Sequence, residues 1–297
     1  MDEIRNRQNR LSQKTKRRNE QSPTRIHAKA QMTGKIIFKT CEALYDERRY
    51  PNNRRELTYI LGSRCIDGVV LVGDRKVTLS GGTDFDFEDK ILMDVEPMVV
   101  GSSGVSGLFD KFRSQVGTLV QSHQAGMEIQ KFISEIEKIT KTLNDSYHEI
   151  LQEQVFDVLL AFKLPRFSAL QYIYPFGFAE GVRKYRAIGH GEPYGSILLK
   201  QLWRQNMNME QVAELGYFII KYIEKFELDN SVGVGSGHPQ IWFIPDDPAG
   251  ISEEEKAKYR IHMADNSLLE RFQKETEKKL ELFQENTFKK FFSSTVF

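Results

Sequence analysis

Strand-like and helix-like stretches alternate in runs along this chain, and their order restricts the fold more than any other feature. β-branched and aromatic residues, with Asp67-Gly68 as a hairpin signal, predict a first run of strands at 58–65, 69–72, 76–79, 90–94 and 98–101. Apolar side chains at helical spacing follow. They predict helices at 109–120 and 129–147, then strands at 155–162, 169–174 and 182–188, helices at 197–203 and 212–226, and a last strand at 240–244.

This order favours an α+β fold built of packed layers. Strands grouped in runs pair with their neighbours, whereas a doubly wound parallel sheet needs a helix between successive strands. A helix–sheet–sheet–helix sandwich accommodates the order of this chain. Its 297 residues allow one large domain or two ordinary ones.

The distribution of charge changes where the strand pattern begins. Residues 1–57 hold 15 Lys and Arg against 7 Asp and Glu, whereas the remainder holds 27 against 34. The basic segment has few apolar groups, so it buries too little surface to offset the entropy of ordering. We therefore predict a basic, flexible N-terminal extension or propeptide at 1–57, a core at 58–247 and a helical C-terminal extension at 248–297.

Several function classes are disfavoured by the composition. The sequence shows neither an apolar run near the roughly 18 residues of a membrane span nor a secretory signal after the N-terminal charges. Cys41 and Cys65 do not make a disulfide framework, and the histidines lack metal-ligand spacing. The glycine-rich segments 101–107 and 233–237 lack the Lys-Ser/Thr of a phosphate-binding loop. We expect a cytoplasmic protein that uses no metal or cofactor.

Thr58, Asp74 and Lys90 are the first candidate reactive residues, and by themselves their identities and spacing mean little. Their context is more specific. The segment 58–76 resembles the opening of proteasome β-type subunits, in which a strand begins at the catalytic threonine. The positions that match this family are Gly62, Asp67-Gly68, the Val-rich stretch 69–72, Asp74 and Lys90-Ile91.

The resemblance extends over roughly residues 57–245. Residues 101–107 match the small-residue turn whose backbone N–H binds the oxyanion, with Gly104 at the donor position. Residues 168–177 and 187–191 resemble the family's second hairpin and the start of its third helix. The resemblance implies the four-layer α-β-β-α sandwich of N-terminal nucleophile hydrolases.

The resemblance also implies a mechanism. Thr58 is the nucleophile, and its own α-amine is the base if the chain is cleaved before it. Lys90 tunes that amine, Asp74 pairs with Lys90, and the N–H of Gly104 stabilises the oxyanion. The reaction is endopeptidase cleavage through an acyl-enzyme. The implied partners are polypeptide substrates, related subunits in a ring and an ATP-dependent unfoldase, with no membrane.

Three departures leave an alternative open. Leu57 stands where self-processing subunits carry Gly, and His190 stands where active subunits usually carry Ser. Asp229 begins a match to the family's Asp-x-x-Ser-Gly element, with Val232 in place of the Ser. These changes favour an unprocessed, non-catalytic assembly subunit as the second hypothesis.

Two other readings are less favoured. The α-type subunits of the same particle share the core, but residues 1–57 lack their N-terminal helix and their Tyr- and Gly-rich signature. Nucleic-acid binding through the basic arm is the third hypothesis. Its cluster, Lys14, Lys16, Arg17 and Arg18, has no interleaved aromatic side chains for base stacking.

Overall fold

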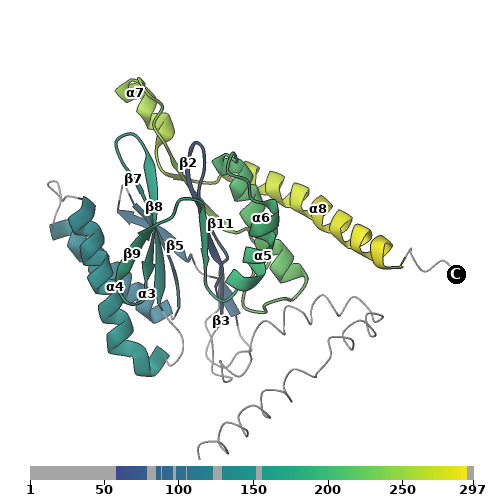
Figure 1. The fold of residues 1–297 in the computed structure, drawn as a ribbon, viewed down its shortest axis with the longest axis horizontal. Helices are drawn as coiled ribbons and strands as arrows, with labels where there is room; N and C mark the ends of the chain where they lie inside the picture. The colour runs from purple at the N-terminus through teal and green to yellow at the C-terminus, as the bar shows by residue number, and fades with distance from the viewer. Residues whose placement is uncertain are drawn as a thin grey trace, which may run out of the picture. The chain divides into compact units, whose positions relative to one another are not determined.

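The computed structural model describes residues 58–78, 85–87, 89–95, 98–104, 106–122, 129–151 and 156–292. All of these residues belong to one compact unit, Asn52–Phe297 (Figure 1). The basic arm, Leu57 and Cys41 lie outside the described residues, so the predictions made for them stay predictions.

The first sheet contains five antiparallel strands and carries the N-terminal end of the described chain. Its order is β10-β1-β2-β11-β12, with bounds Tyr185–Ile188, Ile60–Arg64, Gly68–Gly73, Gln240–Pro245 and His262–Met263. Arg64 pairs with Val69 across the predicted Asp67-Gly68 hairpin, which confirms that turn. β2 lies at the centre of the sheet, and its six residues are all buried.

The second sheet is also antiparallel and follows the chain from strand to strand. Its order is β5-β6-β7-β8-β9, with bounds Ile91–Val95, Met98–Ser103, Asp157–Lys163, Ser168–Tyr174 and Phe178–Gly181. A separate two-stranded sheet pairs β3 (Lys76–Thr78) with β4 (Phe85–Phe87).

The main helices form two groups that cover different sheets. α3 (Ser106–Ser122) and α4 (Ile129–Leu151) lie on the β5–β9 sheet (Figure 1). The other sheet is covered by α5 (Glu192–Leu202), α6 (Met209–Lys225) and α8 (Asn266–Phe292). The short α7 (Glu253–Lys256) and the 3-10 turn Ala257–Tyr259 precede β12.

Three hydrophobic clusters follow from this arrangement. One takes its side chains from both large sheets, including Ile60 and Leu71 from one and Leu159 from the other. The second lies between the β5–β9 sheet and α3 and α4, and the third lies between the first sheet and its helices. Each of the two five-stranded sheets therefore buries both faces. The predicted α+β class is confirmed.

The structure also corrects the predicted elements. The strand predicted at 182–188 is present as β10 but begins later, at Tyr185, and the prediction missed β9, which ends at Gly181 in the other sheet. β12 adds a strand after the one expected to be last. Its two residues are too few to show the alternating pattern by which a strand is recognised in sequence.

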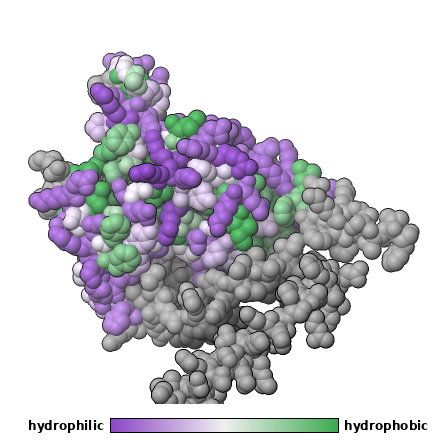
Figure 2. All heavy atoms as spheres, in the orientation of Figure 1, coloured by the Kyte–Doolittle hydropathy of each residue, from purple (hydrophilic) through white to green (hydrophobic). Residues whose placement is uncertain are grey.

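The face of the molecule shown in Figure 2 is mainly hydrophilic, with hydrophobic side chains in several separate places. Within the described part of the chain, the helices are too short or too polar to cross a membrane.

Candidate active site

Thr58 lies two residues before β1 and is buried, with 6% of its surface exposed. Its carbonyl oxygen accepts a hydrogen bond from the backbone N–H of Gly191 at 3.2 Å. Gly189 has a φ of +91°, and a Cβ there would lie 2.1 Å from the same carbonyl oxygen. Only glycine meets both conditions, so the turn after β10 packs tightly against Thr58.

Asp74 is brought beside Thr58 by the register of the β1–β2 hairpin. Ile60 pairs with Gly73, so Tyr59 and Asp74 are the next two residues beyond that pair. The N–H of Tyr59 donates to Asp74 Oδ1 at 2.9 Å, and the N–H of Asp74 donates to the Tyr59 carbonyl at 3.0 Å. The carboxylate therefore lies against the residue that follows Thr58.

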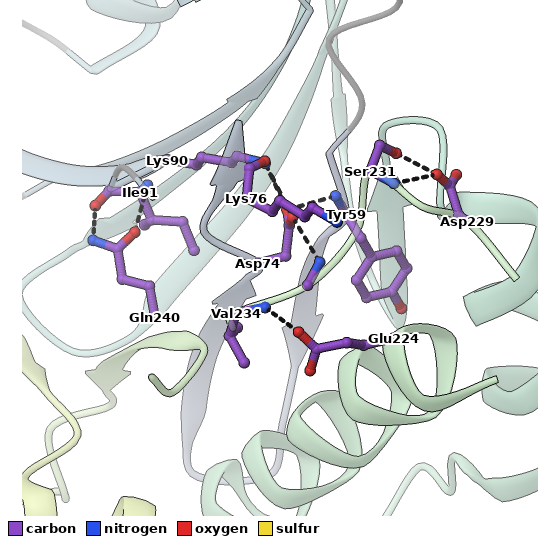
Figure 3. Close-up of polar contacts among 11 residues, drawn as sticks. Tyr59, Asp74, Lys76, Lys90, Ile91, Glu224, Asp229, Ser231, Val234 and Gln240 are labelled. Carbon is purple, nitrogen blue, oxygen red and sulfur yellow. Dashed lines mark hydrogen bonds and ion pairs between the residues drawn. The ribbon is translucent and has the colours of Figure 1, made fainter. Parts of the chain in front are cut away.

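Lys90 completes this group from the other sheet, where it directly precedes β5. Its Nζ lies 2.9 Å from Asp74 Oδ1 and 3.0 Å from Oδ2, and it also donates to the carbonyl of Lys76. Figure 3 shows Asp74 between Lys90 and the backbone of Tyr59. The structure thus brings Asp74 and Lys90 into contact and places Asp74 against the backbone of Tyr59, whereas the described contacts do not join Thr58 itself to either side chain.

The environment of Asp74 has a strong effect on its ionisation. Complete burial raises the pKa of its carboxyl, because a low-dielectric interior disfavours the charged form. The Lys90 ammonium and the N–H groups of Tyr59 and Gly233 act in the opposite direction. Removing one partner of a buried ion pair lowers the free energy of unfolding by much more than the intact pair raises it.

His190 and Asp229 form a second polar pair. His190 Nδ1 lies 2.7 Å from Asp229 Oδ2, while the N–H of Ser231 donates to Oδ1 at 3.0 Å. The Ser231 hydroxyl also donates to Oδ1. Burial acts to raise the pKa of Asp229, but these hydrogen bonds outweigh it and lower the pKa. The side chain is therefore a carboxylate at neutral pH.

One loop connects the two polar pairs. Gly233 follows Asp229 by four residues, and its N–H lies 3.3 Å from Asp74 Oδ2. Its carbonyl accepts from the N–H groups of Arg75 and Lys76, both at 3.1 Å. Val232 is buried with 1% exposed, and a Cβ on Gly191 would lie 2.8 Å from its Cγ2. A valine methyl group thus packs where the resemblance led us to look for a hydroxyl.

Gly104, the predicted oxyanion donor, is only partly placed. It follows β6 and precedes α3, and its φ of +119° is that of a turn which glycine favours. The described contacts do not join it to Thr58. Its role therefore stays a prediction.

The sequence did not reveal the residues that hold this site through the backbone. Gln240 accepts from the N–H of Ile91 at 2.8 Å and donates to the Ile91 carbonyl, which fixes the residue after Lys90 (Figure 3). The one signal available in the sequence was a polar glutamine at the start of an apolar strand. The structure shows this side chain to be buried, and buried polar side chains form hydrogen bonds. Within the described ranges, Asp, Glu, His and Cys side chains do not gather into a group that could hold a metal ion.

The described part of the chain thus has an α+β fold in which Thr58, Asp74 and Lys90 are all buried. Neither the family models nor the curated proteins include a match to the sequence. Among solved structures, Anbu (ancestral beta-subunit) from Yersinia bercovieri is similar, with a TM-score of 0.61, 15% identity, and coverage of 77% of this chain and 97% of that one.

Two structures of Anbu from Hyphomicrobium sp. strain MC1 are also similar. The (Gly-1) mutant gives a TM-score of 0.59 at 16% identity, with coverage of 77% of this chain and 96% of that chain. The other gives 0.58 at 15% identity, with coverage of 77% and 97%. Such low identities show the fold alone.

These comparisons correct the assignment suggested by the sequence. The resemblance to proteasome β-type subunits led us to expect a threonine peptidase of the N-terminal nucleophile hydrolase superfamily. The similar structures are instead Anbu proteins, a proteasome-like family. They support a proteasome-related fold, and they do not support membership in the β-type subunits or a clear place in that superfamily.

Proposed function

We propose that the chain is a proteasome-like subunit that hydrolyses peptide bonds with Thr58 as its nucleophile. The observation that carries this proposal is the buried Lys90–Asp74 ion pair, hydrogen-bonded to the backbone next to Thr58. Buried ion pairs contribute little net stability, because desolvation of both charges offsets most of their attraction. A pair placed at the start of the first strand is better explained by chemistry at Thr58.

In this proposal, each residue has a definite role. A threonine hydroxyl is a weak nucleophile and needs a base. If the chain is cleaved before Thr58, the new α-amine supplies that base, and the Lys90 ammonium favours its neutral form. Asp74 holds Lys90 in place, and the N–H of Gly104 stabilises the oxyanion. An acyl-enzyme forms on Thr58 and is then hydrolysed by water.

The assembly and its setting are part of the same proposal. The similar structures are described as ancestral beta-subunits, which supports related subunits as partners in a ring. Polypeptides are the proposed substrates, and an ATP-dependent unfoldase in the cytoplasm is the proposed source of unfolded chains. The sheets and their covering helices would form a four-layer α-β-β-α sandwich, flanked by extensions at residues 1–57 and 248–297.

A second candidate function is a non-catalytic assembly subunit. Buried Val232 favours it, because an apolar side chain there gives the site no hydroxyl. Leu57, which lies outside the described residues, favours it as well. Nucleic-acid binding through the basic arm also concerns residues outside the described part. Unchanged binding after deletion of residues 1–30 would exclude it.

Peptide hydrolysis by matched threonine variants tests the first proposal. We expect the purified assembly to cleave a fluorogenic peptide, and we expect Thr58→Ala to lose at least ~100-fold in kcat. Thr276→Ala is the control, since it removes a buried hydroxyl on α8. Equal rates for wild type and Thr58→Ala would refute the proposal.

Intact-mass measurement of the same preparations tests processing. A chain that starts at Thr58 provides the α-amine base. A chain that retains Leu57 excludes that base, and it supports the assembly role if peptide cleavage is also absent.

A further inference from the structure

We propose that His190 and Asp229 form the general-base dyad for Thr58, so that a side chain activates the nucleophile without a free α-amine. This inference rests on the proposed role of Thr58 as nucleophile, and it gives the base that a chain not cleaved before Thr58 would use. It accounts for a histidine at this position and for a leucine before Thr58.

The dyad has the geometry that fixes an imidazole for proton transfer. His190 Nδ1 lies 2.7 Å from Asp229 Oδ2, and Ser231 occupies Oδ1 through its N–H and its hydroxyl. Because Asp229 is ionised, Nδ1 must carry the proton that it shares with the carboxylate. The lone pair is then on Nε2, as required of a base whose orientation is set by a carboxylate.

His190 lies in the turn that packs against Thr58. Its two neighbours in the chain, Gly189 and Gly191, both lie against Thr58. The N–H of Gly191 donates to the Thr58 carbonyl at 3.2 Å, and a Cβ on Gly189 would lie 3.3 Å from Thr58 Cγ2. The Thr58 side chain therefore packs against the turn that carries the imidazole.

The two side chains of the dyad differ in burial, and the difference suits one residue that orients the ring and one that exchanges protons. The Asp229 side chain is 4% exposed, whereas the His190 side chain is 25% exposed. A buried carboxylate orients the ring, and a partly exposed ring can exchange its proton with a leaving group or with water. Replacing His190 with a smaller residue also leaves space that opens to solvent.

Lys90 is poorly suited to the same role. Its Nζ donates to both oxygens of Asp74 and to the Lys76 carbonyl, and these three acceptors match the three hydrogens of an ammonium. An ammonium has no lone pair with which to accept a proton. Lys90 instead provides positive charge near Thr58, and His190 accepts the proton.

The proposed step is balanced in atoms and electrons. The Thr58 hydroxyl proton moves to His190 Nε2 while Oγ1 forms a bond to the peptide carbonyl carbon, whose π electrons move to the oxygen. The oxyanion then re-forms the carbonyl as the C–N bond breaks, and the imidazolium proton passes to the leaving amine. Water repeats the sequence on the resulting ester, which frees the acid and restores Thr58 and His190.

Two substitutions at His190 and one at Asp229 test this assignment in the full chain. His190→Ser keeps a hydroxyl that can hydrogen-bond to Asp229 but cannot hold the proton, and His190→Ala leaves room for added imidazole. Asp229→Asn keeps the size of the orienting residue but removes its charge. His148→Ser is the control, because that exposed histidine contacts only the carbonyl of Asp145 on its own helix among its described hydrogen bonds.

The dyad predicts that the three test variants lose roughly 100-fold or more in kcat, while their thermal midpoints and the control stay near wild type. Imidazole restores His190→Ala, which a purely structural histidine would not allow. His190→Ser within threefold of an active wild type overturns the assignment, as does a folded His190→Ala that imidazole leaves inactive. An inactive wild type refutes Thr58 as nucleophile and the dyad with it, which separates the two failures.

Discussion

Replacing Lys90 with methionine removes one charge of the buried pair and preserves the length of the side chain. The substitution deletes the contacts of Nζ with Asp74 at 2.9 and 3.0 Å and its hydrogen bond to the Lys76 carbonyl. Asp74 then keeps only the N–H groups of Tyr59 and Gly233 among its described partners. Breaking a buried pair in this way destabilises a protein by about 3–5 kcal/mol.

The loss of stability is large enough to measure and depends on pH. At about 2–4 °C for each kcal/mol, the thermal midpoint falls by roughly 6–20 °C. Burial already raises the pKa of Asp74, and without Lys90 it rises further. A raised native pKa means that the native state holds the proton more tightly than the unfolded state. The destabilisation of Lys90→Met is therefore smaller at pH 5 than at pH 8.

A double variant separates this stability effect from chemistry. Combining Lys90→Met with Asp74→Asn removes both charges and keeps an acceptor for the N–H of Tyr59. Thermal unfolding and peptide hydrolysis are measured on both variants and the wild type. We expect the double variant to regain most of the lost stability and none of the activity. A Lys90→Met midpoint within 2 °C of wild type would refute the reasoning about burial, and an active double variant would refute the role of the pair.

Two further predictions concern the surroundings of the site. Gly189→Ala places a Cβ 2.1 Å from the Thr58 carbonyl oxygen, so we expect it to lower the thermal midpoint several times more than Gly250→Ala. That control also has a positive φ, of +82°, but its Cβ would meet no atom within 4 Å, and equal shifts would contradict the close packing. Burial raises the pKa of Asp157 to about 6, above its unfolded value of ~3.9, so the native state favours the protonated form. Stability should therefore fall as pH rises from about 4 to about 6, by at most about 3 kcal/mol, and chemical unfolding of Asp157→Asn should show a flatter profile.

Much of the fold could be predicted because its signals are local. The continuous apolar run of β2 and the helical spacing along α4 can be read from neighbouring residues. Sheet membership is a long-range property. Nothing near Gly181 shows that β9 pairs with β8 while β10, which begins at Tyr185, pairs with β1.

The contacts of the site also include some that the sequence could predict and some that it could not. Asp74 could be placed near Thr58 because a hairpin joins their strands, and Lys90 follows from the same motif. The contacts of Gly233 with Asp74 and of Gln240 with Ile91 could not be predicted, because each is made to or by a backbone group of Gly233 or Ile91, and any residue carries such groups. The pairing of His190 with Asp229 spans 39 residues and becomes visible only when two turns meet.

Site mapping with a peptide β-lactone tests the central claim most directly, because this electrophile acylates a reactive hydroxyl whether or not the chain has been processed. The full-length protein is treated with the probe, digested, and analysed by mass spectrometry for the modified peptide. The account predicts one acylated residue, Thr58, and no adduct in Thr58→Ala. An unmodified Thr58, or an adduct that persists in Thr58→Ala at the same rate, would contradict it.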